Sequence, residues 1–325
     1  MKRLGCTLLL AAGLAVNCFP ASDEAAPDWA ASKGGRFIRD AAGRVTEADF
    51  RASWIADPDL ERFAALPDLR RIDLSHTRIT DIGFEHLKQL QNVQSVNLYF
   101  AEQIGDGALA AMKDWKQLRR LSVRGTKVTD AGLAHLANHS ALESLDIGFA
   151  LITDGGFDAL TSLPHLNSLA VGGNKITDVG INSLRLIPTL TALDLSGAQR
   201  TDSGLWSASL TDIGLDVVGS LTRLEHLNLR GTKISDAGTD KLARLTALRS
   251  LDLSETQLSA RGLEVISKFR KLEELHLWNA PRVGDDAIAL LIALPELKWV
   301  DLTGTKVSAE GRAKLHSARP GCRIE

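Results

Sequence analysis

Three side chains in the C-terminal part of the chain are of types that could do chemistry together. Asp252, His276 and Asp301 follow one another at intervals of 24 and 25 residues, and His226 and Glu274 belong to a second series with similar spacing. Carboxylate and imidazole groups are ligands for zinc and other divalent ions. The serines on either side of Asp252 would complete a Ser/His/Asp set for a hydrolase. Whether these side chains meet depends on the elements that carry them.

These residues lie in copies of one short sequence pattern. The run Leu66–Leu74 (LPDLRRIDL) recurs as Leu245–Leu253 (LTALRSLDL) and as Leu294–Leu302 (LPELKWVDL). Most copies are followed by a threonine, an Ile or Val, and then Thr/Ser-Asp-x-Gly. Self-similarity at a fixed period is the signature of a repeat architecture. Eleven repeats, eight of them 24 residues long, begin at Ala42, Leu66, Leu90, Trp115, His139, Leu163, Ile187, Leu221, Leu245, Phe269 and Leu294.

The pattern predicts one short strand and one short helix in each repeat. In Leu-x-Leu the two leucines point into the core and their neighbours face solvent, because side chains alternate along a strand. A single repeat cannot bury its apolar face alone, so the repeats must stack with their strands in parallel. Helices take more room than strands, so the stack must curve. We therefore expect an arc with a concave sheet and convex helices.

Polar residues recur at two further positions of the pattern. The Asp or Thr before x-Gly-Leu can cap the short helix by accepting a hydrogen bond from a free backbone N–H. A second column of hydroxyls is expected to satisfy backbone groups of the stacked loops and to have no chemical role. Its members are Thr77, Thr126, Thr232, Thr256 and Thr305.

The strand pattern together with Ile-Thr-Asp-x-Gly-Leu resembles the leucine-rich repeats of the ribonuclease-inhibitor-like class. The likeness extends to the repeats that follow the F-box in eukaryotic ubiquitin-ligase receptors and to those of exported bacterial proteins. The resemblance implies an α/β fold, namely a right-handed, curved leucine-rich-repeat solenoid of about eleven 24-residue repeats. Its parallel β-sheet would line the concave face and its short helices the convex face. The repeat domain would span 42–325, with 42–65 as the N-terminal capping repeat and 318–325 as the C-terminal cap.

Two departures narrow this resemblance. The stretch before Ala42 is too short for an F-box, and threonines stand where one subclass has cysteine. A substrate receptor of a ubiquitin ligase is therefore disfavoured, and the bacterial exported type fits better. The class hosts many unrelated binding functions, so the resemblance identifies no partner.

The N-terminus has the features of an export signal. Met1-Lys2-Arg3 is a short positive region, and Leu8–Val16 (LLLAAGLAV) is an apolar run too short to span a bilayer. We expect a signal peptide at 1–21, a linker at 22–41, and a secreted, periplasmic or cell-envelope protein. Cys18 leaves open a lipid anchor. No later segment reaches transmembrane length without charges, so we expect no membrane span.

Charge and cysteine content exclude several classes of function. The net charge of −2 provides no basic field for phosphate backbones, so we expect no nucleic-acid partner. The three cysteines form no disulfide framework and have no metal-ligand spacing. Cys322 is expected to be a buried capping residue. His135 and His139 have helical spacing, but no Glu follows His135, and we interpret both as packing residues. We expect no metal and no cofactor.

Insertions into the repeat all fall on the connection from strand to helix. The connections after Leu98 and Leu277 are one residue longer than usual, and the one after Leu195 carries ten extra residues at about Gln199–Ser209. Insertions on one edge of a solenoid often mark its binding side. These insertions bring aromatic residues to that edge, namely Tyr99, Phe100, Trp206 and Trp278. The alternative for the longest insertion is a local duplication in which Trp206 covers only its own loop.

The pattern also predicts which side chains line the concave wall. The position between the two core residues of each strand reads Asp49, Asp73, Asn97, Ser122, Asp146, Ala170, Asp194, Asn228, Asp252, His276 and Asp301. Arg124 and Arg230 stand two residues further along their strands. A polar, acidic wall edged by arginines suits a charged or mixed protein partner and suits membranes poorly. Alternatively, the aspartates are simply part of the repeat pattern and are solvated.

These features predict a non-catalytic scaffold that binds a protein partner outside the cytoplasm, through the concave face and the strand-to-helix loops. Large aromatic and arginine side chains are common interface anchors. The predicted partner-binding residues are Tyr99, Phe100, Arg124, Phe149, Trp206, Arg230, Asp252, His276, Trp278 and Trp299. Two alternatives remain: a structural envelope protein with no specific ligand, and a metal-dependent hydrolase centred on His276. An open wall shelters a transition state poorly, so we expect no enzyme.

Overall fold

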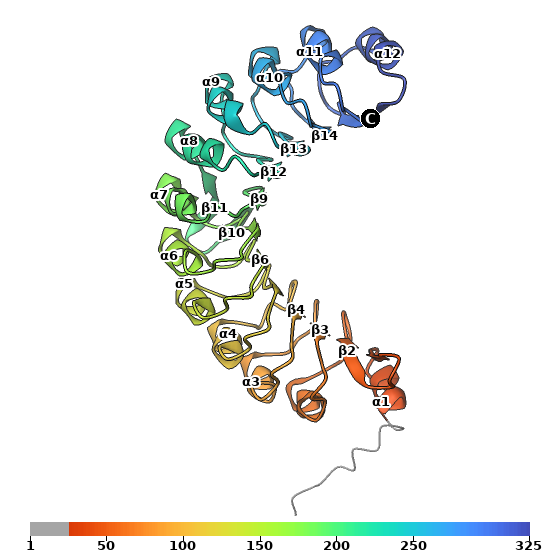
Figure 1. The fold of residues 1–325 in the computed structure, drawn as a ribbon, viewed down its shortest axis with the longest axis vertical. Helices are drawn as coiled ribbons and strands as arrows, with labels where there is room; N and C mark the ends of the chain where they lie inside the picture. The colour runs from red at the N-terminus through yellow and green to blue at the C-terminus, as the bar shows by residue number, and fades with distance from the viewer. Residues whose placement is uncertain (1–25) are drawn as a thin grey trace, which may run out of the picture.

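The computed structural model describes residues 26–325, which form a single arc (Figure 1). Strands line the inner, concave side and helices form the outer, convex side, from the red N-terminal end to the blue C-terminal end. This is the architecture that the repeat pattern predicts. The expected signal peptide and Cys18 lie outside the described residues.

One sheet of 13 strands runs through the described part of the chain, in the order β1-β2-β3-β4-β5-β6-β7-β9-β12-β13-β14-β15-β16. Every pair from β2 onward is parallel, and equivalent residues of successive repeats face one another. The strands are β1 Arg36–Arg39, β2 Val45–Asp49, β3 Arg71–Asp73, β4 Ser95–Asn97, β5 Arg120–Ser122, β6 Ser144–Asp146, β7 Ser168–Ala170, β9 Ala192–Asp194, β12 His226–Asn228, β13 Ser250–Asp252, β14 Glu274–His276, β15 Trp299–Asp301 and β16 Arg323–Ile324.

The helices are short, and several continue into one tighter turn. They are α1 Ala26–Ser32, α2 Glu61–Ala64, α3 Asp81–Glu85, α4 Asp106–Met112, α5 Asp130–Leu133, α6 Phe157–Leu160, α7 Asp178–Asn182, α8 Asp212–Ser220, α9 Asp236–Thr239, α10 Ala260–Ile266, α11 Ile288–Ile292 and α12 Ala309–Ala318. Helices this short are not stable alone, so packing against the neighbouring repeats must hold them.

The core lies between the sheet and the helices and runs the length of the arc. Both apolar strand residues of a repeat are buried, as Ile72 and Leu74 illustrate. The column of threonines behaves as predicted, because each hydroxyl donates to a carbonyl three residues earlier. The Oγ1 of Thr126, for example, lies 2.6 Å from the carbonyl oxygen of Val123.

The helix starts are tied to one another by what we call the Asp–Thr ladder. Thr129 caps α5 by accepting the N–H of Ala131, as predicted. The carboxylate of Asp106, one repeat earlier, accepts both the N–H and the hydroxyl of Thr129, at 2.8 and 2.7 Å. The same two hydrogen bonds, from the N–H and the hydroxyl of a Thr or Ser to an aspartate of the preceding repeat, form in six further pairs: Asp57–Thr80, Asp130–Thr153, Asp154–Thr177, Asp178–Thr211, Asp236–Ser259 and Asp285–Ser308.

The ladder also explains the glycine of Asp-x-Gly. A Cβ on Gly132 would lie 2.3 Å from the Oδ1 of Asp106, which is far inside van der Waals contact. Gly83, Gly180 and Gly214 stand in the same relation to an aspartate of the preceding repeat. The glycine is needed because the carboxylate occupies the space that a side chain would fill.

The segment predicted as a linker instead closes the N-terminal end of the core. Helix α1 lies against β1, and β1 pairs antiparallel with β2. The rings of Trp29, Phe37, Phe50 and Phe63 pack together, with Phe37 and Phe50 5.3 Å apart. An end repeat has no neighbour to cover its apolar face, and these aromatic side chains provide that cover.

At the other end, α12 and β16 complete the stack. Strand β16 pairs with β15 in parallel. Cys322 is buried, as predicted, and burial raises the pKa of its thiol. The guanidinium of Arg319 donates to the carbonyls of Ile292 and Pro295 in the preceding repeat, which fixes the end of α12.

The long insertion forms a β-hairpin. Strand β10 (Ala198–Thr201) pairs antiparallel with β11 (Gly204–Ser209), and β11 pairs with β8 (Ile176–Thr177) of the preceding repeat. The helix of this repeat then begins at Asp212, capped by Thr211. Leu210, which follows the hairpin directly, is buried and fills the apolar position before this helix.

Candidate partner-binding surface

The strand register brings together the residues that could have formed a metal site. Asp252 faces His276 on the next strand, and His276 faces Asp301, as predicted. The imidazole of His276 packs edge-on against the ring of Trp299 at 4.3 Å between ring centroids. Within residues 26–325, no three His, Cys, Asp or Glu side chains are grouped so that they could hold a metal ion. The hydrolase alternative gains no support from this arrangement.

The aspartates of the concave wall are engaged with their own backbone. Asp252 accepts the N–H of Ser254 at 2.8 Å, and Asp301 accepts the N–H of Thr303 at 2.8 Å. The same bond forms at Asp73, Asn97, Asp146, Asp194 and Asn228. A side-chain oxygen that accepts the N–H two residues on stabilises a turn. Most of the acidic stripe is therefore part of the repeat pattern. For Asp252, this favours a structural role in the turn over a role in partner binding.

Arg124 is the most enclosed cation of the wall, with 18% of its side chain exposed. Its guanidinium lies over the ring of Phe149, 4.6 Å from the ring centre. It also lies 3.5 Å from Asp146 and 4.0 Å from Asp194. Burial raises the pKa of Asp146, against the opposing effects of the N–H of Gly148 and of Arg124. We call Arg124, Asp146, Phe149 and Asp194 the first cluster.

A second cluster stands on the wall towards the C-terminus and consists of Arg230, Glu255, Trp278, His276 and Trp299. The guanidinium of Arg230 lies over Trp278, 4.7 Å from the ring centre, and pairs with Glu255 at 2.9 Å. That hydrogen bond raises the pKa of Arg230. Each cluster therefore joins a cation to an aromatic face, an arrangement worth about 0.5–2 kcal/mol depending on how far it is desolvated.

Small residues separate the two clusters. A hollow of about 280 Å³ opens on strands β7, β9, β12, β13 and β14. Ser168, Ala170 and Ala192 line it on β7 and β9, and His226, Asn228, Asp252 and His276 line it on β12 to β14. The small side chains of β7 and β9 leave this part of the wall hollow.

One backbone position per repeat turns into the left-handed region just after the strand, and we call these positions the strand-end column. The column consists of Ala52, His76, Phe100, Gly125, Phe149, Gly173, Gly197, Gly231, Glu255, Asn279 and Gly304. The turn is kept because it lets the N–H reach a carbonyl of the next repeat, as Phe100 does to Arg124 at 2.7 Å. Glycine adopts this conformation without strain, whereas bulky residues rarely do. Each residue with a side chain at this position therefore costs more conformational energy than glycine would.

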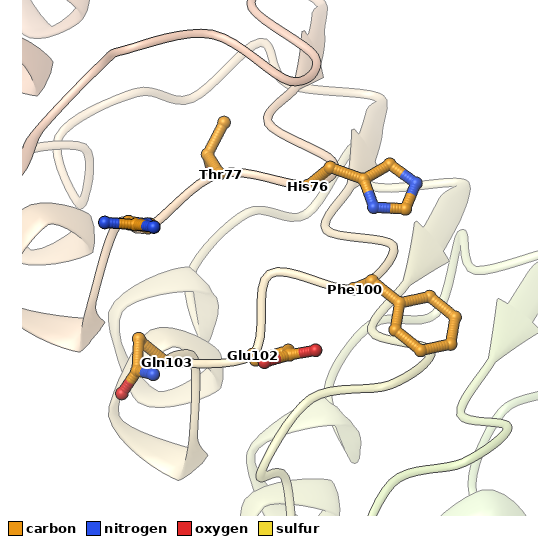
Figure 2. A pocket seen from close by; sticks show the side chains of 6 residues that line it. His76, Thr77, Phe100, Glu102 and Gln103 are labelled. Carbon is orange, nitrogen blue, oxygen red and sulfur yellow. The ribbon is translucent and has the colours of Figure 1, made fainter.

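The predicted residues Tyr99 and Phe100 lie in an aromatic group at the N-terminal end of this column. His76 stacks on Phe100 at 5.9 Å, and Tyr99 meets both rings edge-on. Figure 2 shows the rings of His76 and Phe100 projecting the same way, with Glu102 and Gln103 further along the connection. The sequence reasoning missed His76, although its place in the column after Leu74 could have indicated it.

Trp54, a residue that the sequence reasoning missed, lies next to this group and is 81% exposed. It lines a hollow together with His76, and His76 also lines a neighbouring hollow beside Phe100. Trp206 differs from the other predicted residues, because its indole N–H donates to Ser203 within the hairpin at 2.9 Å. That contact favours the alternative in which Trp206 covers its own loop. The hairpin is tied back by Gln199, which donates to the carbonyl of Ala150.

The fold and its repeats make the chain a leucine-rich-repeat protein. Two family models described as leucine rich repeat match it, at residues 204–258 and 162–184. Among solved structures, it is similar to an internalin from Listeria monocytogenes, with 24% identity and a TM-score of 0.61 over 82% of this chain and 69% of that one. A second internalin of that organism, internalin C2, has 23% identity and a TM-score of 0.49 over 69% and 84%. No curated protein matches the chain in sequence.

None of the helices within residues 26–325 has both the length and the apolar character needed to cross a membrane.

Proposed function

We propose that this protein is a non-catalytic interaction scaffold that binds a protein partner across its concave wall. The observation that carries the proposal is the pair of cation–aromatic clusters, at Arg124–Phe149 and Arg230–Trp278, on either side of a side-chain-poor hollow. Aromatic and arginine anchors around a depression are the composition of interface hot spots. The repeats provide rigid spacing between the two anchors.

The chemistry of the wall supports binding more than catalysis. Its carboxylates are engaged with backbone N–H groups, and the wall is open to solvent along its length. Leucine-rich repeats commonly present such extended concave surfaces to protein partners. We further propose that the chain acts outside the cytoplasm, which the positive and apolar N-terminal segment supports.

Site-specific photo-crosslinking tests the proposal. A photoreactive amino acid at Ala170, beside the hollow, should crosslink one protein in envelope extract. The yield of this crosslink should saturate as the concentration of the chain rises, and an excess of chain without the photoreactive group should abolish it. The same group at Leu186, an exposed residue of the helix side, should not. The crosslinked partner is then purified and its affinity for the wild type is measured by calorimetry.

The variants for that measurement are Arg124→Ala and Trp278→Ala. Each removes one cation–aromatic contact, so each should weaken binding about tenfold or more while leaving the thermal unfolding midpoint within a few degrees of the wild type. Failure to crosslink any saturable partner would favour the structural envelope protein instead. Mass spectrometry of the exported chain gives its first residue, and labelling with a fatty-acid analogue tests lipid attachment at Cys18.

A further inference from the structure

Two hollows, one beside Trp54 and one beside Phe100, share part of their lining on the strand-to-helix edge, and we call the two together the edge groove. The first half, of about 560 Å³, is lined by Trp54, Asp57 and Pro58 among others. The second half, of about 660 Å³, is lined by Phe100, Glu102 and Gln103 among others. His76 and Arg78 line both halves. The edge groove therefore runs across three consecutive repeats.

The backbone of these three repeats carries side chains at a position where five of the other eight repeats have glycine. Ala52, His76 and Phe100 have φ angles of 51°, 56° and 51°, whereas the same position is glycine in five later repeats. A side chain in the left-handed region costs conformational energy. Strain of this kind concentrates at functional sites. Glycine would adopt this backbone conformation at a lower conformational energy. The presence of His76 and Phe100 therefore indicates a role for their side chains other than stabilising the fold.

Trp54 supplies an apolar surface that packing does not explain. With 81% of its surface exposed, it is the most exposed of the large hydrophobic residues within residues 26–325. A tryptophan that keeps its ring in water loses the stabilisation that burial would bring. Together with Phe100 it places one aromatic ring at each half of the edge groove, and His76 stands between them.

Two charged side chains of the edge groove have no ion-pair partner within residues 26–325: Arg78, which lines both halves, and Glu102, which lines only the second. Asp57 is fully engaged with the N–H and the hydroxyl of Thr80, at 2.8 and 2.6 Å. Arg78 has no ion pair with any carboxylate of residues 26–325, although it lines both halves. An occupant that enters here meets a guanidinium with free donors, which suits a carboxylate.

We infer that the edge groove binds an extended segment of the protein partner, with a large apolar side chain in each half and an acidic side chain that pairs with Arg78. The inference rests on the proposed function and adds the chemistry of the partner. Alternate side chains of an extended chain lie about 6.6–6.8 Å apart. The two halves are one repeat apart. Their separation should therefore lie between the distance of neighbouring strands, about 4.8 Å, and the distance of neighbouring helices, about 8–10 Å. Side chains separated by one residue therefore match the two halves.

Selection from a random peptide library tests this inference without knowledge of the partner. The probe is a phage-displayed library of peptides about a dozen residues long, selected on the immobilised full chain. Enriched peptides should carry two large apolar residues separated by one position and an Asp or Glu close by. Their affinity should fall about tenfold with Trp54→Ala and with Phe100→Ala, and should be unchanged with Leu186→Ala, another exposed apolar residue.

Charge reversal gives the sharper arm of the experiment. On Arg78→Glu, selection should switch from acidic to basic peptides, because the guanidinium is lost and the new carboxylate joins that of Glu102 in the edge groove. Lys233→Glu is the matched control, since Lys233 follows a column threonine as Arg78 does, and it should leave the selection acidic. Circular dichroism confirms that each variant is folded.

The inference is overturned if no peptide is enriched, if enriched peptides bind Trp54→Ala and Phe100→Ala as they bind wild type, or if the apolar residues are spaced three or four apart as on a helix. This failure is distinct from failure of the proposed function. A crosslinked partner that binds the wild type and Arg78→Glu equally removes the edge groove and leaves the concave wall in place.

Discussion

The two ends of each strand-to-helix connection follow different rules. At the helix end, the Asp–Thr ladder repeats with little variation, as Asp106–Thr129 and Asp130–Thr153 illustrate. At the strand end, the strand-end column keeps one backbone conformation but changes its side chain from glycine to Phe149 or His76. The comparison teaches that stability is concentrated where the residues are uniform, whereas the side chains available for binding stand where they vary.

The largest effect on stability is expected at a ladder glycine. Gly132→Ala places a Cβ 2.3 Å from the Oδ1 of Asp106, whose carboxylate cannot withdraw without losing Thr129. The unfolding free energy should fall by about 3 kcal/mol. Urea titration of Gly321→Ala, where the new Cβ meets nothing within 4 Å, provides the control. Equal midpoints for the two variants would show that the ladder does not constrain this position.

Substitution of an aspartate of the Asp–Thr ladder should have the second-largest effect on stability. Asp130→Ala removes the acceptor for the N–H and the hydroxyl of Thr153 and should cost about 2 kcal/mol. Asp202→Ala, in the exposed turn of the hairpin, should change stability by less than about 0.5 kcal/mol. Chemical denaturation of both variants measures the difference, and a hairpin variant that is equally destabilised would contradict the assignment.

The strand-end column should show the opposite division between binding and stability. Phe149→Gly removes the ring under Arg124 but relieves a left-handed phenylalanine, so the unfolding free energy should change by less than about 1 kcal/mol. Affinity for the crosslinked partner should fall about tenfold. Calorimetry and denaturation of the same preparation test both statements, and unchanged affinity would remove Phe149 from the site.

The smallest expected effect is a pH dependence at Asp146. Burial raises the pKa of Asp146 in the folded chain above its ordinary value of 3.8, so the unfolded chain ionises first as the pH rises. The contribution of Asp146 to stability is therefore full below pH 3.8 and declines as the pH rises through the folded-state pKa. Asp146→Asn should gain stability relative to wild type between acid and neutral pH. A difference that stays constant with pH would contradict the raised pKa.

The sequence alone was sufficient for the parts of the fold that repetition determines. The alternation of apolar residues placed Asp252 beside His276, and the repeat spacing placed the long insertion at about Gln199–Ser209, where the hairpin lies. Because equivalent positions of the eleven repeats can be compared with one another, the sequence alone shows which positions are apolar and buried and which face solvent.

Prediction failed where a residue has no equivalent in other repeats. The aromatic cap around Trp29 and Phe37 was interpreted as a linker, because its short elements are stabilised only by contact with Phe50 and Phe63. Trp54 was missed because exposure depends on the fold around it. The pairing of Arg124 with Phe149 was not foreseen either, since the two residues belong to neighbouring repeats and the repeat pattern does not show how their side chains are directed.

Hydrogen exchange of the full chain, with and without its crosslinked partner, tests the central claim most directly. The account predicts slower exchange on binding in the segments that carry the clusters and the edge groove, at 52–58, 76–78, 97–103, 122–125, 146–149, 228–231 and 276–279. The convex helices α4 to α11 should exchange as in the free chain. Protection confined to those helices, with the strand ends unchanged, would contradict the assignment of binding to the concave wall and its edge.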